Sequence, residues 1–115
     1  MTESFDFYFD FVSPYSFLAH KEIRRLEKRN LIMVNYKPIL LGGLHNKIGI
    51  TAPALINQKA KYLIKDCKMI AKKFNIDFFF NPSFPINSLN LMRGLISINS
   101  NKKTNSTACS FFNEI

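Results

Sequence analysis

The order of strand, helix and strand over the first forty residues limits what this chain can fold into more than any other feature. Residues 5–12, FDFYFDFV, alternate large aromatic side chains with acidic residues and a tyrosine. This period of two is typical of a strand with one apolar face. Residues 31–40, LIMVNYKPIL, are rich in aliphatic and β-branched side chains and predict a second strand, which should stop near Pro38 because proline cannot donate to a sheet.

A helix is predicted between these two strands, from Tyr15 to about Asn30. Its apolar side chains recur at helical spacing, and they are Leu18, Ala19, Ile23 and Leu26. Short links make this strand–helix–strand unit a right-handed crossover, so the strands should lie parallel in one sheet. The sequence therefore predicts an α/β fold at the amino end.

The rest of the chain is predicted to be helical. We expect an interruption at Gly42-Gly43, followed by a helix over about 54–74 and a loop over 77–87. The next helix should run through Leu89, Met92, Leu95 and Ile96, capped by Asn87 or Ser88. A polar loop over 99–106 and the start of a last helix over 107–115 should follow. Two parallel strands make a poor sheet by themselves, since parallel sheets normally have more strands and are covered on both faces. We therefore expect a chain that is cut short at its carboxyl end.

Length and charge narrow the possible partners. A chain of 115 residues forms one domain with a modest core. Its formal net charge of +8 permits anionic partners, although heavy use of lysine throughout the chain explains the charge without any binding role. Four lysines fall near one helical face without interleaved aromatic side chains, namely Lys61, Lys65, Lys68 and Lys72. We interpret them as a solvated face and expect neither nucleic acid nor a membrane as partner.

The cysteines and the apolar segments indicate a compartment. No apolar run approaches the length that crosses a bilayer, and the amino terminus is acidic and aromatic. Cys67 and Cys109 lie far apart and form neither a CxxC pair nor a metal-ligand pattern. We therefore expect a cytoplasmic protein without a disulfide framework or a metal site, whose cysteines are ordinary core or surface thiols.

The junction Ser13-Pro14-Tyr15-Ser16 allows two interpretations. Ser13 before Pro14 is a standard helix start, because a serine hydroxyl caps a free backbone N–H and proline is preorganised for the first helical position. The amino end of a helix also stabilises an anion such as a thiolate. The spacing equals that of the Cys-x-x-Cys redox motif with oxygen in place of both sulfurs, so disulfide cycling is excluded at this site. A hydroxyl can still donate a hydrogen bond to the thiolate of a ligand.

Four stretches of the chain carry a family resemblance. FYFDFVSPYSFLA, YKPILLGGL, QKAKYLIKD and FPINSLNLMRG resemble, in this order, segments of 2-hydroxychromene-2-carboxylate isomerase and of its relative, kappa-class glutathione transferase. These proteins belong to the DsbA-like branch of the thioredoxin fold. The resemblance implies a βαβ part over residues 1–40, then an all-helical insertion over 41–115, with the carboxyl half of the thioredoxin sheet missing.

The resemblance also implies a function. In this family, the serine equivalent to Ser13 holds the thiol of glutathione, and the isomerase uses glutathione as a cofactor that adds to and leaves a small aromatic-derived substrate. Ser13 is the expected catalytic residue, and Pro14 and Tyr15 are expected to form the turn and wall of the glutathione site. The alternatives are a kappa-class-like transferase and an inactive or split-gene fragment that needs a partner, either a second copy or a separately encoded carboxyl half.

The remaining candidate residues have weaker support. Lys59 falls where the family has a basic residue near the glutathione peptide, but it fits equally well on a solvated helix face. Ile50 replaces the family's usual asparagine, so one side-chain contact with glutathione should be absent. His20 and His45 are interpreted as surface histidines, and Arg93 as an exposed or packing residue.

Overall fold

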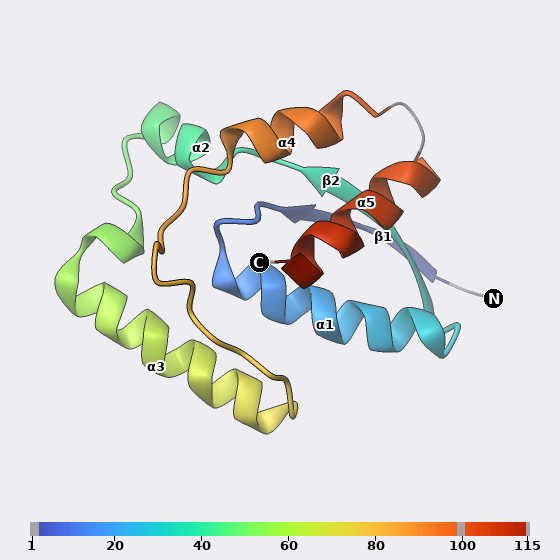
Figure 1. Cartoon of the computed structure of the whole chain (residues 1–115), viewed down its shortest axis with the longest axis horizontal. Coiled ribbons are helices and arrows are strands. Elements are labelled where there is room, and N and C mark those ends of the chain that lie inside the picture. The colour runs from blue at the N-terminus through green and yellow to red at the C-terminus, as the bar shows by residue number, and fades with distance from the viewer. Residues whose placement is uncertain (1–2, 99–100, 115) are drawn as a thin grey trace.

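The structure is a computed structural model that describes residues 3–98 and 101–114 (Figure 1). Strand β1 (Glu3–Phe9), helix α1 (Pro14–Lys28) and strand β2 (Ile32–Pro38) follow one another along the chain. The strands pair in parallel, with Phe5 opposite Val34 and Phe7 opposite Tyr36. The predicted parallel strand–helix–strand unit is therefore confirmed.

Strand β2 ends at Pro38 as predicted, whereas β1 starts and ends earlier than the sequence predicts. The first strand was expected over residues 5–12, but β1 ends at Phe9 and the chain turns at Asp10. The carboxylate of Asp10 accepts a hydrogen bond from the Val12 N–H (3.0 Å), and the Asp10 carbonyl accepts one from the Ser13 N–H (3.0 Å). These two bonds replace the next step of the sheet ladder with a turn. That turn delivers Ser13 to the start of α1.

The part after β2 is helical, with different boundaries from those predicted. Its elements are α2 (Leu41–Ile48), the 3₁₀ helix η1 (Pro53–Leu55), α3 (Asn57–Lys73), α4 (Leu89–Ile96) and α5 (Asn101–Glu114). The single helix expected over 54–74 is divided at Ile56, whose backbone is extended. The last helix begins at 101, well before the predicted 107, so most of the polar segment expected as a loop is helical. Residues 99, 100 and 115 of those two predictions lie outside the described residues.

The expected interruption at Gly42-Gly43 is wrong, because both glycines lie inside α2. At the start of this helix the Leu41 N–H donates a hydrogen bond to the Asp10 carboxylate, and the Leu44 N–H donates to the Leu40 carbonyl. At its end the Ile50 N–H donates to the His45 carbonyl. The helix ends instead at Gly49, whose φ of 74° suits a residue without a β-carbon.

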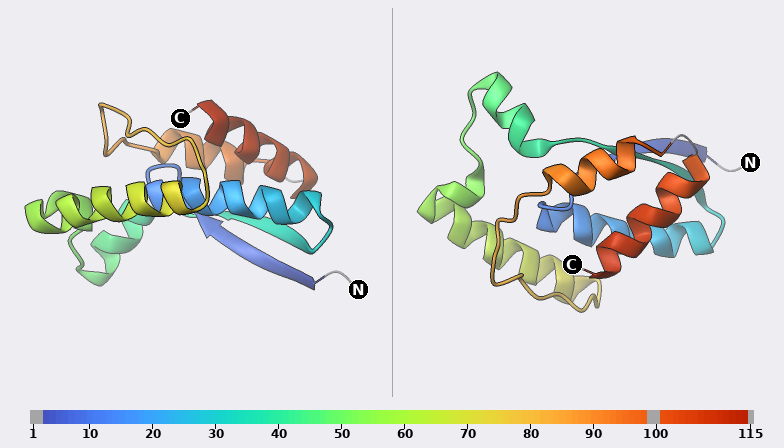
Figure 2. Two further views of the ribbon diagram at one scale, coloured as in Figure 1. Left: turned by 90° about the horizontal axis from the view of Figure 1, so that it is seen from below. Right: turned by 45° about the horizontal axis from the view of Figure 1, so that its top comes forward.

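Two hydrophobic cores lie on either side of α1. The sheet core joins the inner faces of β1 and β2 to α1, α4 and α5, and its buried members are Phe9, Phe11, Ile23, Val34, Tyr36, Met92, Leu95, Ala108 and Phe112. The α3 core is smaller and consists of Leu18 from α1 with Leu63, Cys67 and Ala71 from α3. In the left view of Figure 2, α1, α4 and α5 lie on one side of the sheet. The start of α1 therefore lies where the two cores meet.

The other face of the sheet is exposed. It carries Tyr8 and Met33, which are 61% and 63% exposed, and a hydrogen bond from Asn35 to Asp6 (3.1 Å). Among the helices in the described part of the chain, none combines the length and the apolar character that crossing a bilayer requires.

Candidate functional site

Ser13 caps the amino end of α1, and the cap does not use its hydroxyl proton. Its backbone is extended (φ −83°, ψ 118°), and its Oγ accepts a hydrogen bond from the Ser16 N–H at 3.2 Å, while Pro14 occupies the first turn. The capping interpretation is therefore confirmed. Capping uses only a lone pair of Oγ, and the hydroxyl proton has no acceptor among the groups that the structure describes. The two interpretations of this junction are thus compatible, because the Ser13 Oγ accepts a hydrogen bond as the cap while its proton can be donated to a ligand.

The buried side chain of Asp10 stabilises this junction, and the sequence did not reveal this role. The side chain is 1% exposed. Its Oδ1 accepts hydrogen bonds from the Val12 N–H and from the Ser88 hydroxyl, and its Oδ2 accepts one from the Leu41 N–H at 2.8 Å. One carboxylate therefore ties the β1–α1 turn to the starts of α2 and α4.

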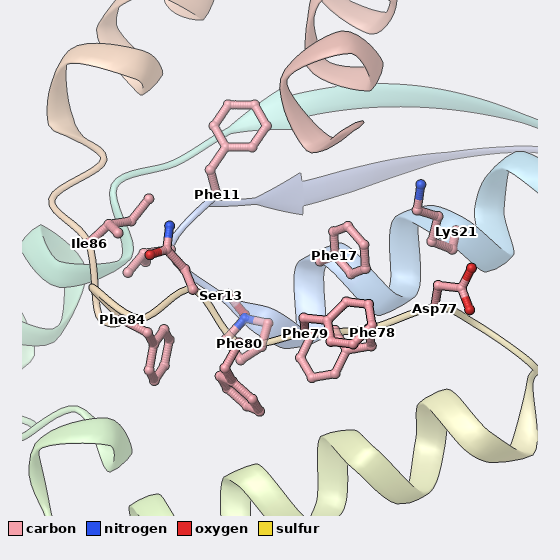
Figure 3. A pocket seen from close by; sticks show the side chains of 13 residues that line it. Phe11, Ser13, Phe17, Lys21, Asp77, Phe78, Phe79, Phe80, Phe84 and Ile86 are labelled. Carbon is pink, nitrogen blue, oxygen red and sulfur yellow. The ribbon is translucent and has the colours of Figure 1, made fainter. Parts of the chain in front are cut away.

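A cleft lined by aromatic rings opens on one side of Ser13. This phenylalanine cleft has a volume of about 270 Å³, and its ring-bearing lining consists of Phe11, Phe17, Phe78, Phe79, Phe80 and Phe84. In Figure 3 several of these rings lie between Ser13 and the far end of the cleft, which Lys21 and Asp77 form. Phe80 packs edge to face with Phe78 and with Phe84, at centroid distances of 4.9 Å and 5.3 Å. This geometry suits a planar apolar group.

A second cleft opens on the other side of the same turn. This α2 cleft, of about 370 Å³, is lined by Ser13, Pro14 and Tyr15 together with residues of α2, of η1 and of the segment before α4. Asp10 and His45 also line it. Ser13 and Pro14 thus lie between two clefts, one rich in phenylalanine and one lined largely by aliphatic groups and backbone.

Tyr15 connects α1 to α3. Its hydroxyl donates a hydrogen bond to Asp66 at 2.7 Å, and burial and this bond raise its pKa. Tyr15 also lines a shallow third cleft of about 380 Å³ beside the α2 cleft, and Lys59 lines that one. The structure therefore brings Ser13, Pro14 and Tyr15 together in one cleft and places Lys59 next to it, on the far side of Tyr15.

Other candidate residues lie away from the clefts or have structural roles. Ile50 is 52% exposed and lines neither cleft at Ser13. Asn87 accepts a hydrogen bond from the Leu89 N–H (3.1 Å) and so helps to cap α4, whereas Ser88 gives its hydroxyl to Asp10. Arg93 is exposed, as expected, and so are the four lysines of the basic face of α3.

The interpretation of His20 as a surface residue is wrong. Its side chain is 2% exposed and stacks on Phe112 at 4.4 Å, because it lies three residues before Ile23 on the apolar face of α1. That position was the signal in the sequence. His45 is half-buried and lines the α2 cleft. Within the described residues, no group of three or more His, Cys, Asp and Glu side chains is arranged to hold a metal ion.

Comparison with known proteins places this geometry in a family. A model of the DSBA-like thioredoxin domain matches residues 4–115. The chain belongs to the DSBA-like thioredoxin domain family. The structure of a 2-hydroxychromene-2-carboxylate isomerase superposes with a TM-score of 0.82 at 27% identity, over 96% of this chain and 54% of that one. The thioredoxin-like fold predicted from the sequence is therefore confirmed.

Two named groups of this DSBA-like family are similar in sequence. The 2-hydroxychromene-2-carboxylate isomerase of Sphingobium xenophagum is 32% identical over 78% of this chain and 47% of its own length. Glutathione S-transferase kappa 1 of Caenorhabditis elegans is 32% identical over 69% of this chain and 35% of its own length. The resemblance to both groups is confirmed. The chain spans less than half the length of these curated relatives.

Proposed function

We propose that this chain binds glutathione and activates its thiol at Ser13, as part of a glutathione-dependent isomerase similar to 2-hydroxychromene-2-carboxylate isomerase. The observation that carries the proposal is the hydrogen-bond state of Ser13, whose Oγ accepts from the Ser16 N–H and whose proton has no acceptor in the described residues. Ser13 can therefore donate to a sulfur anion without giving up its cap.

The energetics of this arrangement favour an ionised thiol. A hydrogen bond to a charged group contributes about 1.5–3 kcal/mol, and the amino end of a helix adds about 0.3–1 kcal/mol. Together these effects lower the pKa of a bound thiol by roughly one to three units from about 8.5. A larger share of the thiol is then the nucleophilic thiolate near neutral pH. That thiolate would add to the substrate and leave it again, which is covalent catalysis by a cofactor.

The two clefts suggest how the ligands would divide the space. We assign the glutathione peptide to the α2 cleft, where Pro14 and Tyr15 form the wall and Lys59 lies close enough to the rim to pair with a carboxylate. We assign a small aromatic-derived substrate to the phenylalanine cleft, because its rings offer faces and edges to a planar group. Ser13 lines both clefts, so a thiolate beside it would face the substrate.

The second candidate is a kappa-class-like glutathione transferase, which is favoured by similar identity to the two named groups. Both reactions need the same thiolate at Ser13 and differ in what the substrate does next. Because the chain spans only part of each relative, we state as proposals the activity of the whole protein, a partner that is either a second copy or a separately encoded carboxyl half, and the cytoplasmic location. The two free cysteines are consistent with a reducing compartment.

Calorimetry with glutathione at neutral pH tests the proposal. Ser13→Thr keeps a hydroxyl that can both cap and donate, whereas Ser13→Ala removes both roles and Ser13→Asp keeps only the cap. We expect binding to weaken about tenfold or more in Ser13→Ala and Ser13→Asp and to be largely retained in Ser13→Thr. S-methylglutathione, which has no thiol to ionise, should bind wild type and Ser13→Ala with similar affinity. Equal glutathione binding by wild type and Ser13→Ala would contradict the assignment of Ser13, and absence of binding by folded wild type would contradict binding by this chain alone.

A further inference from the structure

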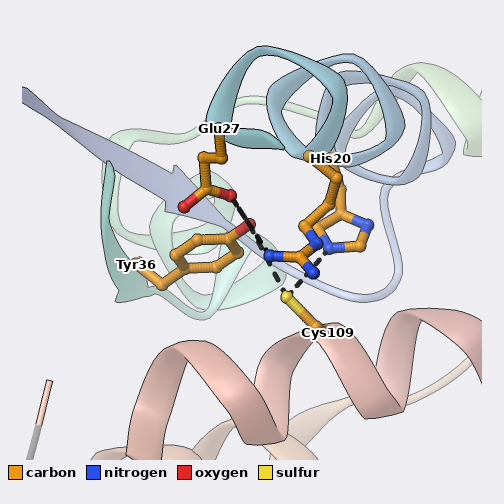
Figure 4. Close-up of polar contacts among 5 residues, drawn as sticks. His20, Glu27, Tyr36 and Cys109 are labelled. Carbon is orange, nitrogen blue, oxygen red and sulfur yellow. Dashed lines mark hydrogen bonds and ion pairs between the residues drawn. The ribbon is translucent and has the colours of Figure 1, made fainter. Parts of the chain in front are cut away.

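A partly buried polar cluster lies between α1, β2 and α5, on the sheet side of α1 and apart from Ser13. In Figure 4, His20 and Tyr36 are both joined to the sulfur of Cys109, and Glu27 lies beyond the Tyr36 hydroxyl. The His20 Nε2 lies 3.3 Å from Cys109 Sγ, which lies 3.8 Å from the Tyr36 hydroxyl. The Tyr36 hydroxyl in turn donates to Glu27 at 3.3 Å. Nothing in the function proposed above uses these groups.

The imidazole of His20 is fixed and neutral. It is 2% exposed and is held against the Phe112 ring of α5. Burial, followed by the positive charges of Lys21 and Arg24, lowers the pKa of His20 to about 4, so the ring carries one proton at neutral pH. Its Nδ1 is buried and has no hydrogen-bond partner among the described residues.

That unpartnered nitrogen indicates which nitrogen carries the proton. A proton on Nδ1 would leave a buried N–H donor unmatched, which is the costlier arrangement for a buried polar group. A proton on Nε2 instead points at the sulfur of Cys109. The His20 Nε2–H therefore donates a hydrogen bond to the Cys109 sulfur from the buried side of the thiol.

The front of the sulfur is accessible. Cys109 is half-buried and lines a cleft of about 250 Å³ with Arg24, Glu27, Tyr36 and Ser106. Cys67, the other thiol of the chain, differs in both respects. It is fully buried in the α3 core, and burial raises its pKa to about 11. The chain therefore contains one enclosed thiol and one thiol that has a hydrogen-bond donor, His20, on its buried side and lines a cleft.

We propose that Cys109 is a thiol–disulfide exchange site that takes up a small disulfide, with His20 as a positioning residue. The Cys109 thiol gives its proton to solvent and the thiolate attacks one sulfur of the disulfide. The disulfide bond of the ligand breaks as the new bond to Cys109 forms, and the released thiolate takes a proton from solvent. One disulfide is consumed and one is made, so no further oxidant is needed. His20 Nε2–H donates to the sulfur anion during the attack.

The test uses oxidised glutathione as probe, with intact-protein mass and peptide mapping to follow the adduct on the folded chain. We expect one glutathionyl group, on Cys109, in wild type and in Cys67→Ser, and none in folded Cys109→Ser. The adduct on Cys109 is measured by mass and glutathione binding at Ser13 by calorimetry, so failure of the proposed glutathione site and failure of this inference are distinguishable. Modification of Cys67 at a similar rate, or no adduct on Cys109, would overturn the proposal.

The role of His20 needs a readout that simple loss of packing would not give. His20→Phe keeps an aromatic ring against Phe112 but removes the donor, and His20→Gln keeps an N–H near the position of Nε2 but removes the ring. We expect the rate at Cys109 to fall about tenfold in His20→Phe and to recover most of that loss in His20→Gln. Tyr36→Phe, which keeps its ring in the core and removes the acceptor of the Cys109 thiol proton, should react faster than His20→Phe. Equal rates in wild type and in folded His20→Phe would overturn the positioning role.

Discussion

The two sides of α1 are held in different ways. On the sheet side the structure buries polar groups together with the apolar core, namely Asp10, His20 and Ser88, each no more than 3% exposed. On the α3 side the buried cluster contains only apolar side chains and the Cys67 thiol. Buried polar groups with satisfied hydrogen bonds fix a single geometry more strictly than apolar contacts do. The sheet side therefore sets the position of Ser13, and the α3 side supplies a more adaptable wall.

The links across each side show the same contrast. The Asp10 carboxylate, which is 1% exposed, accepts hydrogen bonds from two segments that are 31 and 78 residues away in the sequence. Among the described residues, the links between α1 and the α3 side include an exposed hydrogen bond from Tyr15 to Asp66 and the apolar packing of Leu18 and Phe17. We expect perturbations of the sheet side to have the larger effects.

Removal of the buried carboxylate should have the largest effect. Asp10→Ala leaves the N–H groups of Val12 and Leu41 and the Ser88 hydroxyl without their acceptor, and we expect the free energy of unfolding to fall by about 3–5 kcal/mol. Urea denaturation measures this loss. Ser88→Ala, which removes one of the three bonds, should cost about 1–2 kcal/mol, and Asp66→Ala on the α3 side less than about 1 kcal/mol. The comparison breaks down if Asp66→Ala costs as much as Asp10→Ala.

Acid should destabilise the protein through His20. Since the folded pKa of about 4 lies below the ordinary value of 6.5, the unfolded chain binds the proton first as the pH falls. Stability is therefore complete above about pH 6.5 and is lost progressively down to about pH 4, by up to about 3 kcal/mol. Unfolding in urea across this range should show the loss in wild type, with a smaller loss in His20→Phe. If the free energy of unfolding depends on pH in the same way in wild type and in His20→Phe, His20 does not cause the loss of stability in acid.

The smallest effect is expected at the rim of the α3 side. Lys59 is exposed, so an ion pair with a ligand carboxylate contributes only about 0.2–1 kcal/mol, and Lys59→Gln should weaken glutathione binding by no more than about fivefold. Added salt should reduce even that difference. Lys65→Gln is the matched control, because Lys65 lies on the basic face of the same helix and lines neither the α2 cleft nor the cleft of Lys59. If the two variants bind alike, Lys59 belongs to the solvated face.

Local patterns predicted the local features of the site. Alternation in the strands and a serine before a proline were enough for the parallel βαβ unit and for the cap at Ser13, because each depends on neighbours within a few residues. The phenylalanine cleft was not predicted, since a segment with two prolines reveals a loop but not the part of the fold against which its aromatic rings pack.

Polar contacts between residues far apart in the chain could not be predicted from the sequence. The alternating pattern put Asp10 on the polar face of a strand, and nothing near it in the sequence indicates that Leu41 and Ser88 donate to it. The same contact helps to explain the error at Gly42-Gly43, because α2 starts where Asp10 holds the Leu41 N–H although glycine disfavours helix. The roles of Ser13, Pro14, Tyr15 and Lys59, and the division at residue 40, stay predictions.

The most direct test of the account is the ionisation of the glutathione thiol when it is bound to this chain. Thiolate absorbs in the ultraviolet where the thiol does not, so a pH titration of the difference spectrum gives the pKa of the bound thiol in wild type and in Ser13→Ala. We predict a pKa at least about one unit below that of free glutathione in wild type, with most of the shift lost in Ser13→Ala. An unshifted pKa in wild type, or the same shift in both proteins, would contradict the central claim that Ser13 stabilises the thiolate.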